Sequence, residues 1–93
     1  MHWVYILYSE RLDRYYIGET IDLNNRLNEH NTGFYKNSFT SKTNDWTLFV
    51  NIACDDVFQA KKIEKHIKKM KSKTYIKNLN FYPEIISRLK NNN

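Results

Sequence analysis

The sequence has little of several features that mark particular classes of protein. Its 93 residues include one cysteine, one proline and two glycines, and no apolar run is long enough to cross a bilayer. The single cysteine, Cys54, excludes an internal disulfide framework and argues against a cysteine-built zinc site. Nothing at the N-terminus has the pattern of a signal peptide, so we expect a cytoplasmic protein that does not associate with membranes.

What the chain does have is positive charge and aromatic side chains. Lys and Arg outnumber Asp and Glu by 15 to 10, which gives a formal net charge of +5, and seven residues are tyrosines. The excess of positive charge favours an anionic partner without identifying it. From the length we expect one domain over residues 1–90, followed by a frayed tail at 91–93.

Two short runs near the start have the composition of β-strands. The runs 2–8 and 15–18 are rich in Tyr, Ile and Val, and a short charged link joins them, which predicts an antiparallel hairpin. Both faces of the first run are apolar, so we expect a central strand. Tyr16 and Gly18 share a face of the second run, where the glycine leaves room for a ligand or another backbone.

A helix is expected next, over residues 23–30, with Thr20 or Asp22 as its N-cap. Arg26 and His30 are four residues apart and are therefore neighbours on this helix. Two interpretations stay open here. Arg26 and His30 are either a functional pair, or a surface arginine and a half-buried histidine at a helix end. The second situation is the more common one.

The stretch 31–45 has no usable periodicity, and we predict a long loop there. Its Phe34 and Phe39 either attach the loop to the body of the domain or contact bases, and attachment is slightly favoured. The run 46–54 that follows is the clearest strand signal in the chain.

A long amphipathic helix is predicted over residues 57–73, with an apolar stripe spaced by threes and fours. Glu64 falls inside that stripe, and a carboxylate that faces a core must be satisfied by a partner or a metal ion. The alternative is that Glu64 turns outward and pairs with Lys61 or Lys68. We weigh these two placements equally on the pattern alone.

The opposite face of the same helix is basic, as in a solvated surface or a surface that binds a phosphate backbone. Its lysines are Lys61, Lys62, Lys65, Lys68 and Lys69. Beyond it we expect a helical turn or short helix over 74–80 and a last helix over 83–90 that begins at the proline. The fold class is therefore α+β, a three-stranded, mostly antiparallel sheet flanked by helices in the order β-β-α-β-α-α.

The polar residues singled out above are chemically sufficient for phosphodiester hydrolysis with one metal ion. A carboxylate can hold a hard divalent ion that keeps most of its waters, and an arginine can stabilise the charge that builds on the phosphate. A phenol or an imidazole can relay the proton of the attacking water. A two-metal carboxylate cluster or a phosphate-binding glycine loop is not apparent in the sequence.

These residues resemble the GIY-YIG nuclease superfamily, in particular its small stand-alone bacterial members. Trp3-Val4-Tyr5 stands where the first signature triplet is expected, with Trp3 in place of the glycine. Tyr16-Ile17-Gly18 is the second triplet intact. The resemblance extends to about Asn80 and keeps the family's order of elements.

The resemblance implies catalytic roles for residues of the hairpin and of the first helix. Tyr5 and Tyr16 would line the cleft, one of them as the general base. Arg26 would clamp the phosphate, and His30 would relay a proton or contact the phosphate.

The resemblance also implies a metal site. Glu64 would be the sole protein ligand of a single Mg²⁺ or Mn²⁺ ion, and Asn78, or alternatively Asn80, would complete the site. The implied activity is metal-dependent endonucleolytic cleavage of DNA at branched, flapped or damaged sites, with RNA as an open alternative. A partner protein or a homodimer would supply specificity. The second hypothesis is a nucleic-acid-binding module with a catalytically silent nuclease site, and a purely structural interaction protein ranks third.

Overall fold

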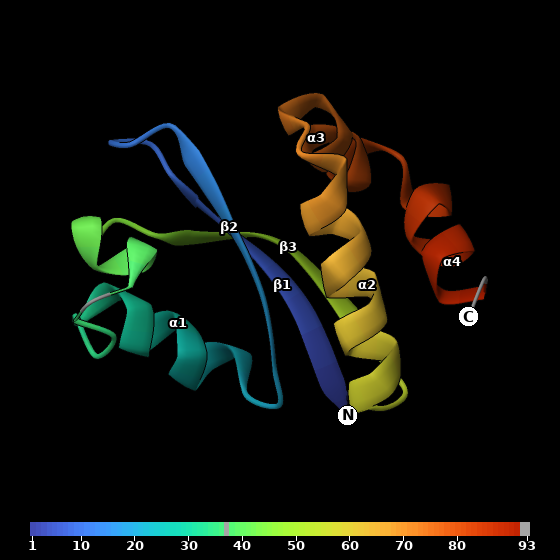
Figure 1. The fold of residues 1–93 in the computed structure, drawn as a ribbon, viewed down its shortest axis with the longest axis horizontal. Helices are drawn as coiled ribbons and strands as arrows, with labels where there is room; N and C mark the ends of the chain where they lie inside the picture. The colour runs from blue at the N-terminus through green and yellow to red at the C-terminus, as the bar shows by residue number, and fades with distance from the viewer. Residues whose placement is uncertain (37, 92–93) are drawn as a thin grey trace.

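The computed structural model describes residues 1–36 and 38–91. Within them, a three-stranded antiparallel sheet in the order β2-β1-β3 runs through the middle of the molecule, and helices cover both faces (Figure 1). The strands are β1 (His2–Ser9), β2 (Arg14–Thr20) and β3 (Thr47–Cys54). The helices are α1 (Leu23–Asn31), the short 3-10 helix η1 (Phe39–Lys42), α2 (Val57–Met70), α3 (Lys73–Phe81) and α4 (Pro83–Asn91). The predicted α+β class is confirmed.

The strand β1 is central because both of its faces are apolar. It pairs with β2 on one side and with β3 on the other. Val4 and Ile6 point to one face of the sheet, Tyr5 and Leu7 point to the other, and all four side chains are buried. The expectation of a central first strand is therefore confirmed.

The two faces of the sheet carry different cores. On one face, α2 and α3 bury an aliphatic cluster: Val4, Ile6, Val50, Ile52, Cys54, Ala60, Ile63, Ile67, Ile76 and Leu79. On the other face, α1 covers a smaller cluster built on aromatic side chains: Tyr5, Leu7 and Trp46, with Leu12, Tyr16, Leu23 and Leu27 packed against them. Figure 1 shows α1 and α2 on opposite sides of the sheet.

The long helix α2 ends three residues earlier than its predicted end at residue 73. Lys71 adopts a left-handed conformation with φ of 48°, which stops the helix. The Ser72 side chain then accepts a hydrogen bond from the backbone N–H of Tyr75 and so caps α3. Met70, the last residue of α2, is 44% exposed.

The stretch 31–45 is not wholly irregular, because it contains η1. The indole Nε1 of Trp46 donates to the backbone oxygen of Thr40 at 2.9 Å, and this bond fixes η1 against the sheet. Phe39 contributes to the attachment, with its ring 6.0 Å from that of Trp46, whereas Phe34 is 64% exposed. The attachment predicted for both phenylalanines is thus correct for Phe39 only. Asn37 lies outside the described residues.

The last helix begins at Pro83 as predicted, but it continues through Asn91. Asn91 is therefore not part of a frayed tail, and residues 92–93 lie outside the described residues. None of the helices in the described part of the chain has the length and apolar character needed to span a membrane.

Candidate functional site

A chain of hydrogen bonds starts at the central strand and runs through α1 to η1. The hydroxyl of Tyr5 lies 3.0 Å from Nε2 of His30. The other ring nitrogen of His30, Nδ1, lies 2.7 Å from Oγ1 of Thr40, which also contacts the Ser38 hydroxyl at 2.9 Å. Three segments far apart in the sequence are thus joined by buried polar atoms, all of which have partners.

The protonation of this chain follows from its burial. Burial lowers the pKa of His30 to about 4, and the positive charge of nearby Arg26 acts in the same direction, so the imidazole is neutral at pH 7. Burial raises the pKa of Tyr5 well above its ordinary value, against the opposing effect of Arg26. Tyr5 therefore keeps its proton, and the neutral imidazole of His30 donates from one ring nitrogen and accepts at the other between the hydroxyls of Tyr5 and Thr40. A phenol that holds its proton this firmly is a poor general base.

The space above Gly18 is filled by Tyr5. The two residues are directly opposite each other on β1 and β2, and a Cβ atom built on Gly18 would lie 2.6 Å from Cζ of Tyr5. The prediction that this glycine leaves room for a ligand or another backbone is therefore wrong. The side chain of Tyr5, on the neighbouring strand, fills this space.

Tyr16 is the more accessible of the two predicted tyrosines. Its side chain is half-buried, and its ring centroid lies 5.0 Å from that of His30 and 6.3 Å from that of Tyr5. The structure thus brings Tyr5, Tyr16 and His30 together. Tyr5 is fully buried in this group, and Tyr16 is the more exposed of the two tyrosines.

Arg26 projects from α1 toward β2 and lies beside this group. Its Nη1 donates to the backbone oxygen of Glu19 at 3.5 Å, and its Nε lies 3.4 Å from Oε1 of Glu29. The guanidinium also lies over the ring of Tyr35, 5.8 Å from its centroid. These contacts hold the arginine half-buried at β2 and leave part of its planar set of donors free for an anion.

Three residues of this site were not predicted from the sequence. Tyr35 donates to Oε1 of Glu29 at 2.7 Å, and its ring centroid lies 4.9 Å from that of His30. Thr40 completes the hydrogen bonds of His30. The aromatic content of the stretch 31–45 was the only sequence signal for Tyr35, and no signal pointed to Glu29 or Thr40.

Glu64 comes from the other side of the sheet, on α2. Its carboxylate lies 3.1 Å from Nζ of Lys68, and its side chain is 19% exposed. This is the ion pair that the sequence left open as an alternative. Across residues 1–36 and 38–91, no hydrogen bond or ion pair joins Glu64 to Tyr16, Arg26 or His30, so the structure does not bring the whole predicted set into contact.

The direction that Glu64 faces can nevertheless be derived from the packing of α2. The helix lies on β1 and β2, and its Gln59 donates to the backbone oxygen of Lys90 on α4 at 3.3 Å. Glu64 is about 140° around the helix from Gln59, so it faces away from α4 and toward the outer edge of β2. Arg26 reaches β2 from the opposite face of the sheet. The two charged side chains therefore approach one strand from its two sides.

The remaining predicted residues lie on the α2 side of the sheet. Asn78 is half-buried on α3 and Asn80 is exposed, and neither side chain is joined to the tyrosine and histidine group in the described residues. The five lysines of α2 are all exposed, as a surface that binds phosphates requires: Lys61, Lys62, Lys65, Lys68 and Lys69.

The donor set restricts the kind of metal site that the described residues could form. They contain no group of three or more His, Cys, Asp or Glu side chains able to hold a metal ion. A site on Glu64 would therefore use one carboxylate and water or substrate oxygens. Mg²⁺ and similar hard ions accept such sites because they retain several waters.

The comparison with known protein families identifies the family of this chain's main region. Residues 1–80 match the family described as the GIY-YIG catalytic domain. The matched region contains both signature triplets, α1 and the whole of α2. No curated protein and no solved structure gives a significant match.

Proposed function

The chain belongs to the GIY-YIG catalytic domain family, a family of nuclease domains, and on this basis we propose that it is a divalent-metal-dependent endonuclease acting on DNA. The observation that carries the proposal is the grouping of Tyr16 and Arg26 beside the buried chain from Tyr5 through His30 to Thr40. A site with a fixed floor and two reactive side chains at its surface suits one phosphodiester.

Arg26 is proposed to bind the scissile phosphate. Its contacts to Glu19 and Glu29 orient the guanidinium without using all of its donors. Charge-assisted hydrogen bonds to the non-bridging oxygens become stronger as negative charge builds on the phosphate, and such donors account for a large part of the rate.

Tyr16 is proposed as the residue that accepts the proton of the attacking water. Only a phenolate can accept this proton, and an ordinary tyrosine, with a pKa near ~10, is a weak base that needs a nearby cation or a metal-bound hydroxide to be effective. Tyr5 and His30 are positioning residues in this scheme, because both are buried and their hydrogen-bonding atoms are already used. The burial of His30, which is 3% exposed, argues against the direct phosphate contact that the family resemblance left open.

Glu64 is proposed to hold a single Mg²⁺ or Mn²⁺ ion, with Asn78 as a more distant contributor. The fit rests on a half-buried carboxylate whose partner, Lys68, is exposed and easily displaced. Such an ion would supply Lewis-acid stabilisation of charge on the phosphate and on the leaving oxygen.

The substrate is proposed to be branched, flapped or damaged DNA, with specificity supplied by a partner protein or a homodimer. The exposed lysines of α2 support an anionic substrate. We place the activity in the cytoplasm, in keeping with the single buried cysteine. The second candidate is a module that binds nucleic acid without cleaving it, and the ion pair of Glu64 with Lys68 is the observation that favours it.

A cleavage assay tests the proposal. Linear, nicked, flapped and four-way DNAs are incubated with Mg²⁺ or Mn²⁺ and with the wild type, Glu64→Gln or Arg26→Gln. Each variant is expected to lose about 10³-fold in rate, which is typical for removing a charge-stabilising group. Glu10→Gln and Arg14→Gln, both exposed at the hairpin, are the matched controls. Salt-sensitive binding without cleavage by the wild type would support the second candidate instead.

A further inference from the structure

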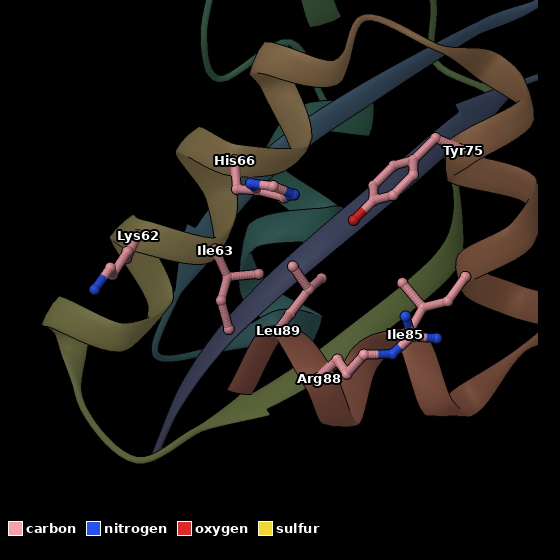
Figure 2. A pocket seen from close by; sticks show the side chains of 7 residues that line it. All are labelled: Lys62, Ile63, His66, Tyr75, Ile85, Arg88 and Leu89. Atoms are coloured by element: carbon pink, nitrogen blue, oxygen red, sulfur yellow. The ribbon is translucent and has the colours of Figure 1, made fainter. Parts of the chain in front are cut away.

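A cavity of about 450 Å³ lies between α2, α3 and α4 (Figure 2). By the spacing of an α-helix, its lining residues on α2 lie on the flank of the helix away from Glu64. This volume is within the range of small-molecule sites. Seven residues line it: Lys62, Ile63, His66, Tyr75, Ile85, Arg88 and Leu89.

The cavity combines an apolar floor with a positively charged rim. Ile63, Ile85 and Leu89 supply the apolar surface, and Lys62 and Arg88 supply the charge. Both cationic side chains are exposed, and neither forms an ion pair with any described residue of the chain. Two cations without counterions beside an apolar floor favour a ligand that has an apolar body and more than one negative charge.

Aromatic side chains add a second property. The rings of His66 and Tyr75 pack edge to face with centroids 6.1 Å apart, and both border the cavity (Figure 2). Burial raises the pKa of the Tyr75 phenol, so its hydroxyl stays protonated and available as a donor. Flat aromatic surfaces beside cationic side chains are typical of sites that bind unpaired bases.

The lysines of α2 connect this cavity to the edge of β2. Around the helix from Glu64, one meets first Lys68 and Lys61, then Lys65 and Lys69, and finally Lys62 at the cavity. All five are exposed, so a phosphate backbone that passes the proposed site could follow them across the outer surface of α2.

We propose that this cavity binds one nucleotide of an unpaired strand of the substrate. The base would lie on the apolar floor against Tyr75 and His66, and the phosphates on its two sides would meet Lys62 and Arg88. The identity of the ligand as nucleic acid rests on the proposed nuclease function. Ile85, Arg88 and Leu89 lie beyond residue 80, outside the region matched by the family, so α4 adds this site to the catalytic domain.

The test uses deoxyadenosine 3′,5′-bisphosphate as the probe, without metal, and follows the amide resonances of the full chain by NMR. The resonances of residues around the cavity, Tyr75 and Leu89 among them, are expected to shift with the probe. Arg88→Gln and Lys62→Gln are each expected to raise the Kd for the probe about fivefold, as for the loss of one exposed charge-assisted contact. Unphosphorylated deoxyadenosine should bind the wild type more weakly than the probe does. It should bind the wild type, Arg88→Gln and Lys62→Gln equally well, because it has no phosphate to meet either cation.

Two further variants make the result specific. Tyr75→Leu keeps the apolar volume and removes the aromatic ring, so weaker binding of both deoxyadenosine and the bisphosphate is expected. Arg14→Gln, on the hairpin and outside the cavity, should bind as the wild type does. All of these side chains are exposed or half-buried, so the variants should keep their fold.

The outcomes separate this proposal from the nuclease proposal because no cleavage is measured. Binding that is unaffected by both Arg88→Gln and Lys62→Gln, or shifts that map elsewhere, would overturn it even if the chain cleaves DNA. Cavity resonances that move with protein concentration would also overturn the proposal, because a second copy of the chain would then occupy the cavity. Binding with the expected variant pattern would support it even in a chain that fails to cleave.

Discussion

The two faces of the central sheet are built from the same strand by different chemistry. On the α2 face, Val4 and Ile6 of β1 meet an aliphatic cluster. On the α1 face, Tyr5 of the same strand joins a hydrogen-bonded chain with His30 and Thr40. Alternation along one strand therefore directs apolar packing to one side and polar contacts to the other.

This difference affects how each face responds to substitution. An aliphatic cluster tolerates changes that keep volume and hydrophobicity, because its interactions have no direction. A buried polar chain requires each donor and acceptor to have its partner, and losing one partner leaves another group unsatisfied. The α1 face should therefore be the less tolerant one, which suits a face that positions reactive groups.

The largest expected effect is that of Gly18→Ala on stability. The added Cβ would collide with the ring of Tyr5, so the free energy of unfolding should fall by about 3 kcal/mol, as in overpacked cores. Ile63→Val on the α2 face should cost only about 1 kcal/mol. Urea unfolding measures both. The double variant Gly18→Ala with Tyr5→Leu should recover part of the loss, and a Gly18→Ala protein as stable as the wild type would contradict the contact.

The pH dependence of stability should come from the α1 face. His30 is neutral in the fold with a pKa of about 4, whereas an unfolded histidine has a pKa of ~6.5. As the pH falls, the unfolded state therefore binds the proton first. The contribution of neutral His30 to stability is complete above pH ~6.5 and is lost as the pH falls toward 4. We expect a loss of about 3 kcal/mol between neutral pH and pH 4, measured by urea unfolding at a series of pH values. His30→Gln should flatten the profile, and an unchanged slope in that variant would assign the loss to other groups.

Tyr16→Phe should separate catalysis from binding. The hydroxyl is proposed to accept a proton while the ring contacts His30, so we expect cleavage to slow at least about tenfold with substrate affinity nearly unchanged. Single-turnover cleavage and fluorescence anisotropy measure the two quantities. Tyr15→Phe, on the other face of β2, is the matched control. Equal losses of cleavage and of binding in Tyr16→Phe would make this hydroxyl a contact residue only.

The smallest effect should come from the exposed surface of α2. Lys65→Gln and Lys69→Gln should leave stability unchanged and should each reduce the slope of log K against log salt concentration by about one for DNA binding. Titrations at several salt concentrations give this slope. Lys42→Gln, on the α1 side of the sheet, provides the comparison, and an equal change there would mean that binding follows net charge alone.

Much of this architecture could be predicted from local pattern. The alternation in β1, the threefold and fourfold spacing in α2 and the proline at the start of α4 indicate their elements directly, because each depends on near neighbours in the sequence. The proximity of Arg26 and His30 is equally local. The end of α2 was missed because the left-handed conformation of Lys71 leaves no composition signal, although Ser72 is a recognisable N-cap.

Contacts between distant segments were decided by the tertiary structure alone. Tyr5 faces Gly18 because of strand register, and Thr40 reaches His30 because η1 folds back over α1. Whether Glu64 faces a metal site or Lys68 depends on which edge of the sheet its helix flanks. Periodicity can place a side chain on a face of its own helix or strand. Which residue it meets on the next element depends on how the elements pack. That packing is determined by the volumes and polar groups of the whole chain, so a local pattern does not contain it.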